Sequence, residues 1–110
     1  MAIKSNQVAT IWGDWSGTGT VSVRDSYGLS SIGDNGAGNY TMNFSADMSN
    51  NDYLAFGNCS QSIDSVGHYD SIQLYDFYQG SVRVTTFGSA DSAGGKDDME
   101  IVCAGVIGSY

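Results

Sequence analysis

The stretch that decides the fold runs from Leu29 to Phe44 and reads LSSIGDNGAGNYTMNF. Its first part, 29–33, is a short predicted strand, and the DNGAGN cluster at 34–39 is rich in residues that accept positive φ. From Tyr40 onward, large apolar residues at 40, 42 and 44 alternate with polar ones. A strand, a Gly/Asn turn and an alternating strand predict a β-hairpin with one buried face.

Short segments of the same kind continue on both sides of this hairpin. Gly and polar residues separate them, with predicted turns at 12–17 and 79–80, a break at 25–28 and polar loops at 46–52, 60–71 and 88–98. No window shows the apolar spacing of an amphipathic helix. Seven or eight short strands predict an all-β chain, a single antiparallel β-sandwich or jelly-roll-like domain over residues 1–110. Besides the hairpin, the predicted strands are 7–12, 18–24, 53–59, 72–78, 81–87 and 99–107.

The charge of the chain excludes several classes of partner. The chain has twelve Asp and Glu residues and four Lys and Arg residues, which gives a formal net charge of −8. So few cations cannot neutralise a phosphate backbone or an anionic membrane surface, so we expect no nucleic-acid partner and no membrane insertion. The N-terminal residues MAIKSN lack the apolar core of a signal peptide, which favours assembly in a cytoplasm.

Residues capable of chemistry are few. Cys59 and Cys103 lie outside any CxxC motif, which favours two reduced thiols over a disulfide or a zinc site. Four carboxylates lie in the segment Asp91–Glu100, and such a segment is more often a solvated loop than a divalent-metal site. His68 is the single imidazole, and no serine lies in a nucleophile elbow. We therefore expect no cofactor, no metal and no enzymatic activity.

Aromatic side chains exceed what a thin core can absorb. Exposed Trp and Tyr favour interfaces, because they combine a large apolar area with a polar tip. The last predicted strand, 99–107, is apolar on both sides, which indicates burial on both faces or against a symmetry mate. Core filling and stacking on glycan sugars are the alternatives for any one aromatic. The interface candidates are Trp12, Trp15, Tyr75, Phe77, Tyr78, Ile101, Val106 and Tyr110.

Two blocks of the sequence resemble a known family. Trp12 and Trp15 with GTGTVSVRDS at 17–26, and then LSSIGDNGAGNYTMNF at 29–44, are similar to a C-terminal module of tail-fibre and other virion proteins of tailed bacteriophages. GSVRVTTF at 80–87 resembles a late strand of that module, and Asp47-Met48 resembles a later step in which Ser49 replaces a proline.

This resemblance implies a place on the surface of a virion assembled in a host cytoplasm. We expect a non-enzymatic structural knob of tail-fibre type or a decoration subunit, which contacts capsid or tail proteins. Its expected state is a homo-oligomer, most simply a trimer. The alternative is an adhesin module that binds a host receptor glycan.

Overall fold

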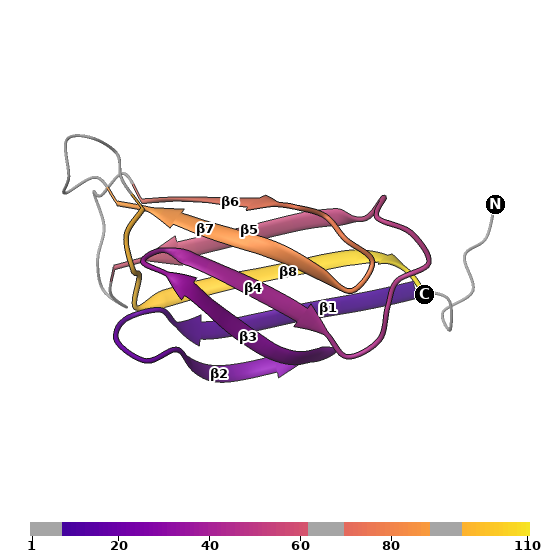
Figure 1. Cartoon of the computed structure of the whole chain (residues 1–110), viewed down its shortest axis with the longest axis horizontal. Coiled ribbons are helices and arrows are strands. Elements are labelled where there is room, and N and C mark those ends of the chain that lie inside the picture. Colours follow the sequence, from indigo (N-terminus) through magenta and orange to yellow (C-terminus); the bar gives the residue numbers. More distant parts are fainter. Residues whose placement is uncertain (1–7, 62–69, 89–95) are drawn as a thin grey trace.

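The strands of this protein form two four-stranded antiparallel sheets in a computed structural model, which describes residues 8–61, 70–88 and 96–110 (Figure 1). One sheet has the order β2-β1-β8-β5 and the other β3-β4-β7-β6. The two sheets pack face to face, which confirms the predicted all-β sandwich. The strands are β1 (Val8–Ser16), β2 (Ser22–Tyr27), β3 (Leu29–Gly36), β4 (Asn39–Phe44), β5 (Leu54–Ser60), β6 (Ser71–Tyr75), β7 (Ser81–Phe87) and β8 (Ile101–Ser109).

The core lies between the sheets and is built by two-residue alternation. In β4 the predicted inward residues 40, 42 and 44 are all buried. The ring of Tyr40 meets that of Trp15 in β1 edge to face, with 5.7 Å between centroids, so an aromatic pair joins the two sheets. The buried core consists of Ala9, Ile11, Trp15, Tyr40, Met42, Phe44, Met48, Val82, Val84, Met99, Val102, Ala104 and Val106.

The first strand is longer than predicted, and the expected turn at 12–17 is wrong. β1 continues to Ser16 because Gly13 serves packing rather than turning. A Cβ at Gly13 would lie 2.7 Å from Cδ1 of Leu29 and 3.4 Å from the ring of Trp15. The missing side chain therefore makes room for two core groups, and the strand stays extended through it.

Other boundaries also differ from the prediction. β2 runs from Ser22 to Tyr27 rather than over 18–24, and all six of its residues are exposed because it is an edge strand. Gly28 alone then carries the chain across to β3 in the other sheet, with a φ of 75° that favours glycine. β6 ends at Tyr75, since Asp76 adopts a φ of 52°.

The last strand, β8, occupies the centre of its sheet between β1 and β5. Its inward residues Val102, Ala104 and Val106 are buried in the core. Its outward residues Ile101, Cys103 and Ile107 stay partly or fully exposed. Within one copy of the chain, β8 is therefore buried on its inner face only, and the outer face of this sheet stays uncovered.

Candidate functional site

Large apolar side chains line the outer face of the β2-β1-β8-β5 sheet in two cross-strand rows. In the first row Tyr27 is opposite Trp12, Trp12 is opposite Gly105, and Gly105 is opposite Phe56. In the second row Thr10 is opposite Ile107, which is opposite Leu54. We call the five large members of these rows the apolar band: Trp12, Tyr27, Leu54, Phe56 and Ile107.

The band is open to solvent. Its side chains are between 36% and 64% exposed, whereas inward neighbours on the same strands, such as Ile11 and Val106, are fully buried. The alternation of a strand sends one set of residues into the core and the other set outward, so an apolar outward set has no partner within this sheet. A contiguous exposed apolar patch on a small protein marks an interaction surface.

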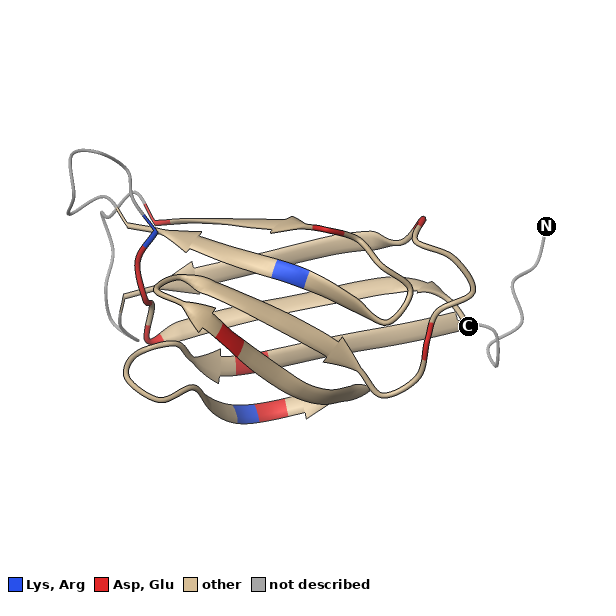
Figure 2. Cartoon of the chain, viewed as in Figure 1, with Lys and Arg blue, Asp and Glu red and all other residues tan. Residues whose placement is uncertain are grey.

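No ionisable carboxylate or cation belongs to these two rows. β5 and β8 contain no charged residue at all, and Figure 2 shows acidic and basic positions on β2, β1, β3 and β7 and at the ends of the sandwich. The charges nearest to the band lie in the next row, where Asp14 is opposite Asp25 and Cys103. A neutral apolar face on a chain of net charge −8 can be buried without desolvating an unpaired carboxylate.

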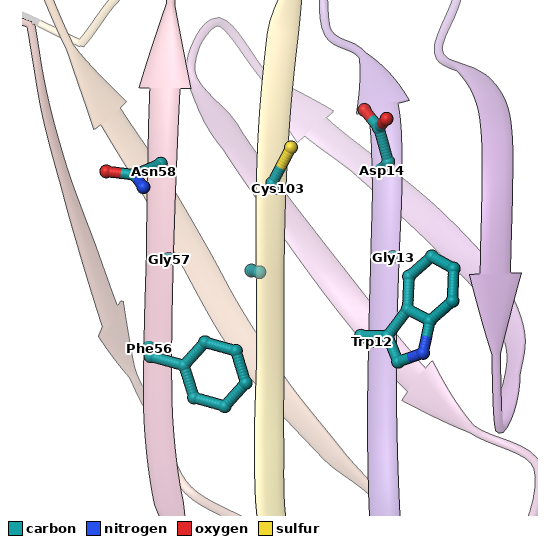
Figure 3. A pocket seen from close by; sticks show the side chains of 8 residues that line it. Trp12, Gly13, Asp14, Phe56, Gly57, Asn58 and Cys103 are labelled. Carbon is teal, nitrogen blue, oxygen red and sulfur yellow. The ribbon is translucent and has the colours of Figure 1, made fainter.

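A hollow of about 450 Å³ opens within this face (Figure 3). Phe56 and Trp12 flank it, and Asp14, Asn58 and Cys103 supply polar groups toward one end. Its remaining lining comes from Gly13, Gly57 and Ala104. A hollow of this size matches the ~300–1,000 Å³ of small-ligand sites and can equally receive one large side chain of a partner.

The polar end of the hollow is held by an ion pair. Nη1 of Arg24 donates to Oδ1 of Asp14 at 3.2 Å, and Nη2 of Arg24 donates to the carbonyl oxygen of Glu100 at 2.7 Å. Burial raises the pKa of the Cys103 thiol, and the charge and hydrogen bond of the Asp14 carboxylate raise it further, while Arg24 opposes them. The thiol is therefore protonated at neutral pH and is a poor nucleophile.

The two cysteines do not form a disulfide. Cys59 is opposite Val102, and Cys103 is opposite Asn58 on the neighbouring strand, so the two side chains point to opposite faces of one sheet. Cys59 packs against the core and donates to the carbonyl oxygen of Ser71 at 3.4 Å. Burial, with a smaller effect from Asp70, raises the pKa of Cys59 to about 11.

Only some of the predicted interface residues remain available to a partner. Trp12 belongs to the apolar band, and Phe77, Tyr78 and Tyr110 are exposed. Tyr75 and Ile101 are half-buried. The prediction is corrected for Trp15 and Val106, which are fully buried in the core.

The sequence reasoning missed Leu54, Phe56 and Ile107 as interface candidates. Leu54 and Phe56 are two residues apart in a predicted strand, so they must share one face, and that spacing was a usable signal. Which face points outward depends on the pairing of β5 with β8. That register is a tertiary property.

The other candidate sites lie partly outside the described residues. His68 and residues 91–95 of the acidic loop lie outside them, and the described part has no cluster of three potential metal ligands. Asp98 accepts hydrogen bonds from the Tyr40 hydroxyl at 2.9 Å and from the Gly38 amide at 2.8 Å. Burial raises the pKa of Tyr40, and the hydrogen bond and charge of Asp98 raise it further, so the Tyr40 hydroxyl stays protonated in this structural contact.

No helix in the described ranges could span a bilayer.

Comparison of the chain with protein family models, with curated proteins and with solved structures finds no match.

Proposed function

We propose that this chain is a non-enzymatic structural protein of a bacteriophage particle, placed on its surface and docked through the apolar band. The observation that carries the docking is the band itself, five exposed large apolar side chains in two adjacent cross-strand rows that contain no Asp, Glu, Lys or Arg. The resemblance of residues 12–26 and 29–44 to a virion module supports the place on a phage. The partners are copies of this chain and neighbouring capsid or tail proteins.

The sheet face limits the size of the contact. Its four strands are six to nine residues long and ~4.8 Å apart, so the whole face covers roughly 19 Å by 25 Å in projection. That is about 480 Å² before side-chain relief is added, against ~800 Å² of accessible surface per partner in a standard interface. A contact centred on the band therefore approaches ordinary size when the neighbouring rows of the same face take part.

The composition of the band also suits docking. Interface centres are rich in Trp, Tyr and Phe and poor in charge, and the band includes Trp12, Tyr27 and Phe56 and no Asp, Glu, Lys or Arg. Copies that each carry a charge of −8 repel one another, so they can approach most easily through a neutral face. The hollow between Trp12 and Phe56 gives such a contact a receiving pocket.

The chemistry of the hollow supports a role without catalysis. Its thiol, Cys103, is kept protonated, and its carboxylate, Asp14, is engaged by Arg24. A thiol nucleophile needs an adjacent base or a lowered pKa, whereas burial and the neighbouring Asp14 carboxylate raise the pKa of Cys103. Binding is therefore the function that these groups serve.

Light scattering of the purified chain, in ordinary and in high salt, tests self-association. We expect a closed oligomer, with three times the 11.6 kDa monomer mass for a trimer. High salt should preserve it, since screening weakens charge repulsion and leaves apolar burial intact. Trp12→Ser with Phe56→Ser should give a monomer, whereas Tyr78→Ser, also an exposed aromatic but outside the band, should leave the mass unchanged.

Two results would count against this proposal. A monomer at every concentration would contradict self-association through the band, and an unchanged mass for the Trp12/Phe56 double variant would show that the contact lies elsewhere. Mass spectrometry of purified particles of the phage that encodes the chain tests the virion assignment directly. Particles that lack the chain would overturn it.

A second candidate function is adhesion to a host glycan, and it is compatible with docking. The observation that favours it is a separate group of exposed aromatic and amide side chains at one end of the sandwich, outside the band. A module docked by its sheet face keeps that end free.

A further inference from the structure

A second hollow lies where the loop between β4 and β5 meets the turn between β6 and β7. It has a volume of about 360 Å³, and Ser49, Asn50, Asn51, Tyr78 and Gln79 line it. From these groups we propose that the hollow binds the ring of a neutral sugar. The proposal rests on the second candidate function, adhesion to a host glycan, and names its site and ligand class. It is independent of docking through the apolar band, because no residue of the band lines this hollow.

Three hydrogen bonds connect the two segments that form this hollow with each other and with the end of β8. The Met48 amide donates to the carbonyl oxygen of Gln79 at 2.8 Å, and the Ser49 amide donates to that of Ser109 at 2.9 Å. Nε2 of Gln79 donates to the carbonyl oxygen of Ser49 at 2.9 Å, which ties the turn to the loop. A preorganised frame lowers the entropy that binding costs.

Tyr53 holds the backbone of Tyr78 in place through a hydrogen bond. Its hydroxyl donates to the carbonyl oxygens of Tyr78 at 2.9 Å and of Ser81 at 3.1 Å. Its ring packs edge to face on Phe77, with 5.6 Å between centroids. The backbone of Tyr78 is thereby anchored, while its side chain is 60% exposed and free to offer a ring face.

Several polar groups of the hollow have bonding capacity to spare. The Tyr78 hydroxyl and the Asn51 amide make no hydrogen bond to any residue in the described ranges, and Asn50 uses its Oδ1 for the Asp52 amide while its Nδ2 donates to none of them. Phenol and amide groups both donate and accept. They match a ligand whose hydroxyl groups also do both.

The combination of one aromatic face with uncharged amides identifies the ligand class. The C–H face of a sugar ring carries partial positive charge and is attracted to the negative face of an aromatic ring. The hydroxyl groups around the ring then reach the amides. None of the five lining residues is an acid or a base with a full charge at neutral pH, and Asp47 and Asp52 flank the loop. That arrangement favours a neutral sugar over an acidic one.

The test is a titration of the full-length, isotope-labelled chain with single sugars, followed by backbone amide NMR signals. The probes are glucose, galactose, mannose and N-acetylglucosamine, with N-acetylneuraminic acid as the acidic comparison. We expect one of the neutral sugars to shift the signals of residues 49–51 and 78–79, with a dissociation constant on the order of 1–10 mM, typical of a ligand this small. The acidic sugar should shift them least.

Variants locate the site. Tyr78→Ala should weaken binding at least ~10-fold by removing the stacking surface, and Asn51→Ala should weaken it ~5-fold by removing one polar partner. The control is Val23→Ala, because Val23 is an exposed apolar residue of β2, 45% exposed, that belongs neither to the apolar band nor to the lining of this hollow. It should bind as the parent chain does.

Three outcomes would overturn the proposal. The first is the absence of any shift up to about 100 mM sugar, far above the expected constant. The second is a set of shifts centred on Trp12 and Phe56, which would place the ligand in the hollow of the band. The third is a Tyr78→Ala chain that binds as well as the parent. Thermal unfolding of each variant shows that the fold is intact, and Asn51→Ala, an exposed loop change, serves if Tyr78→Ala unfolds.

Discussion

The ring of Phe56 lies over Gly105 on the neighbouring strand. A Cβ at position 105 would come within 2.9 Å of Cζ of Phe56 and 3.0 Å of the carbonyl oxygen of Ile11. The glycine thus lets an aromatic ring settle onto the sheet surface between β5 and β1. This contact shapes one side of the hollow, and Trp12 on β1 lines the other side.

Gly105→Ala should therefore destabilise the chain by ~1–3 kcal/mol, since the new methyl group overlaps both neighbours. In a Phe56→Ala background the same change should cost less, because one of the two clashes has gone. Denaturant unfolding of the four chains in a double-mutant cycle measures this coupling. Strict additivity would contradict the contact.

Two glycines with nearly the same φ differ in what surrounds them. Gly38 has φ 61°, and a Cβ there would lie 2.6 Å from the backbone of Asp97 and of Thr86. Gly19 has φ 64° and nothing within 4 Å. Gly19→Ala should cost ~1 kcal/mol from conformation alone, and Gly38→Ala should cost ~3 kcal/mol or more because the backbone must also move. Equal losses in denaturant unfolding would refute this packing.

Alkaline pH should weaken the fold through Cys59. Burial raises the pKa of this thiol to about 11, whereas an unfolded thiol titrates near ~8.5. Between these values the unfolded chain loses a proton that the folded chain retains, so the free energy of unfolding falls as pH rises. Urea unfolding across this pH window should show the decline, and Cys59→Ser should reduce its slope, while Cys103, whose pKa burial also raises, keeps part of it. An unchanged slope in that variant would assign the effect to other groups.

The reactivity of the Cys103 thiol tests its contact with Asp14 in the hollow. Because the Asp14 carboxylate holds the pKa of this thiol up, Asp14→Asn should speed its alkylation by iodoacetamide at mildly alkaline pH. A Cys59→Ser background removes the other thiol. A slower or unchanged rate would show that Asp14 does not govern the thiol.

The same thiol tests docking. Cys103 lies on β8, in the row next to the apolar band, so a partner that covers the band should shield it. Alkylation should therefore slow as protein concentration rises, while in the Trp12→Ser, Phe56→Ser chain the rate should stay constant. Protection that is equal in both chains would place the contact on another surface.

Local patterns in the sequence predicted the strands well where one face is buried. Residues 40, 42 and 44 of β4 point into the core as the alternation required, and the Gly/Asn cluster before them closes a hairpin. The same reasoning failed at Gly13, because a glycine in a strand and a glycine in a turn look alike in sequence. It failed again at β2, where an edge strand has no buried set to show a period.

Side-chain type and period-two spacing were enough to predict the all-β class, the hairpin at 29–44, the inward set of β4 and the net negative charge. The tertiary structure was needed to show that Trp15 and Val106 are core residues while Trp12, Phe56 and Ile107 face outward. Shifting a strand by one residue exchanges its two faces, and the register of β1, β5 and β8 is set by packing between strands far apart in the chain. Both hollows depend on the tertiary structure in the same way. Each is lined by segments that are far apart in the chain and lie side by side only in the folded sandwich.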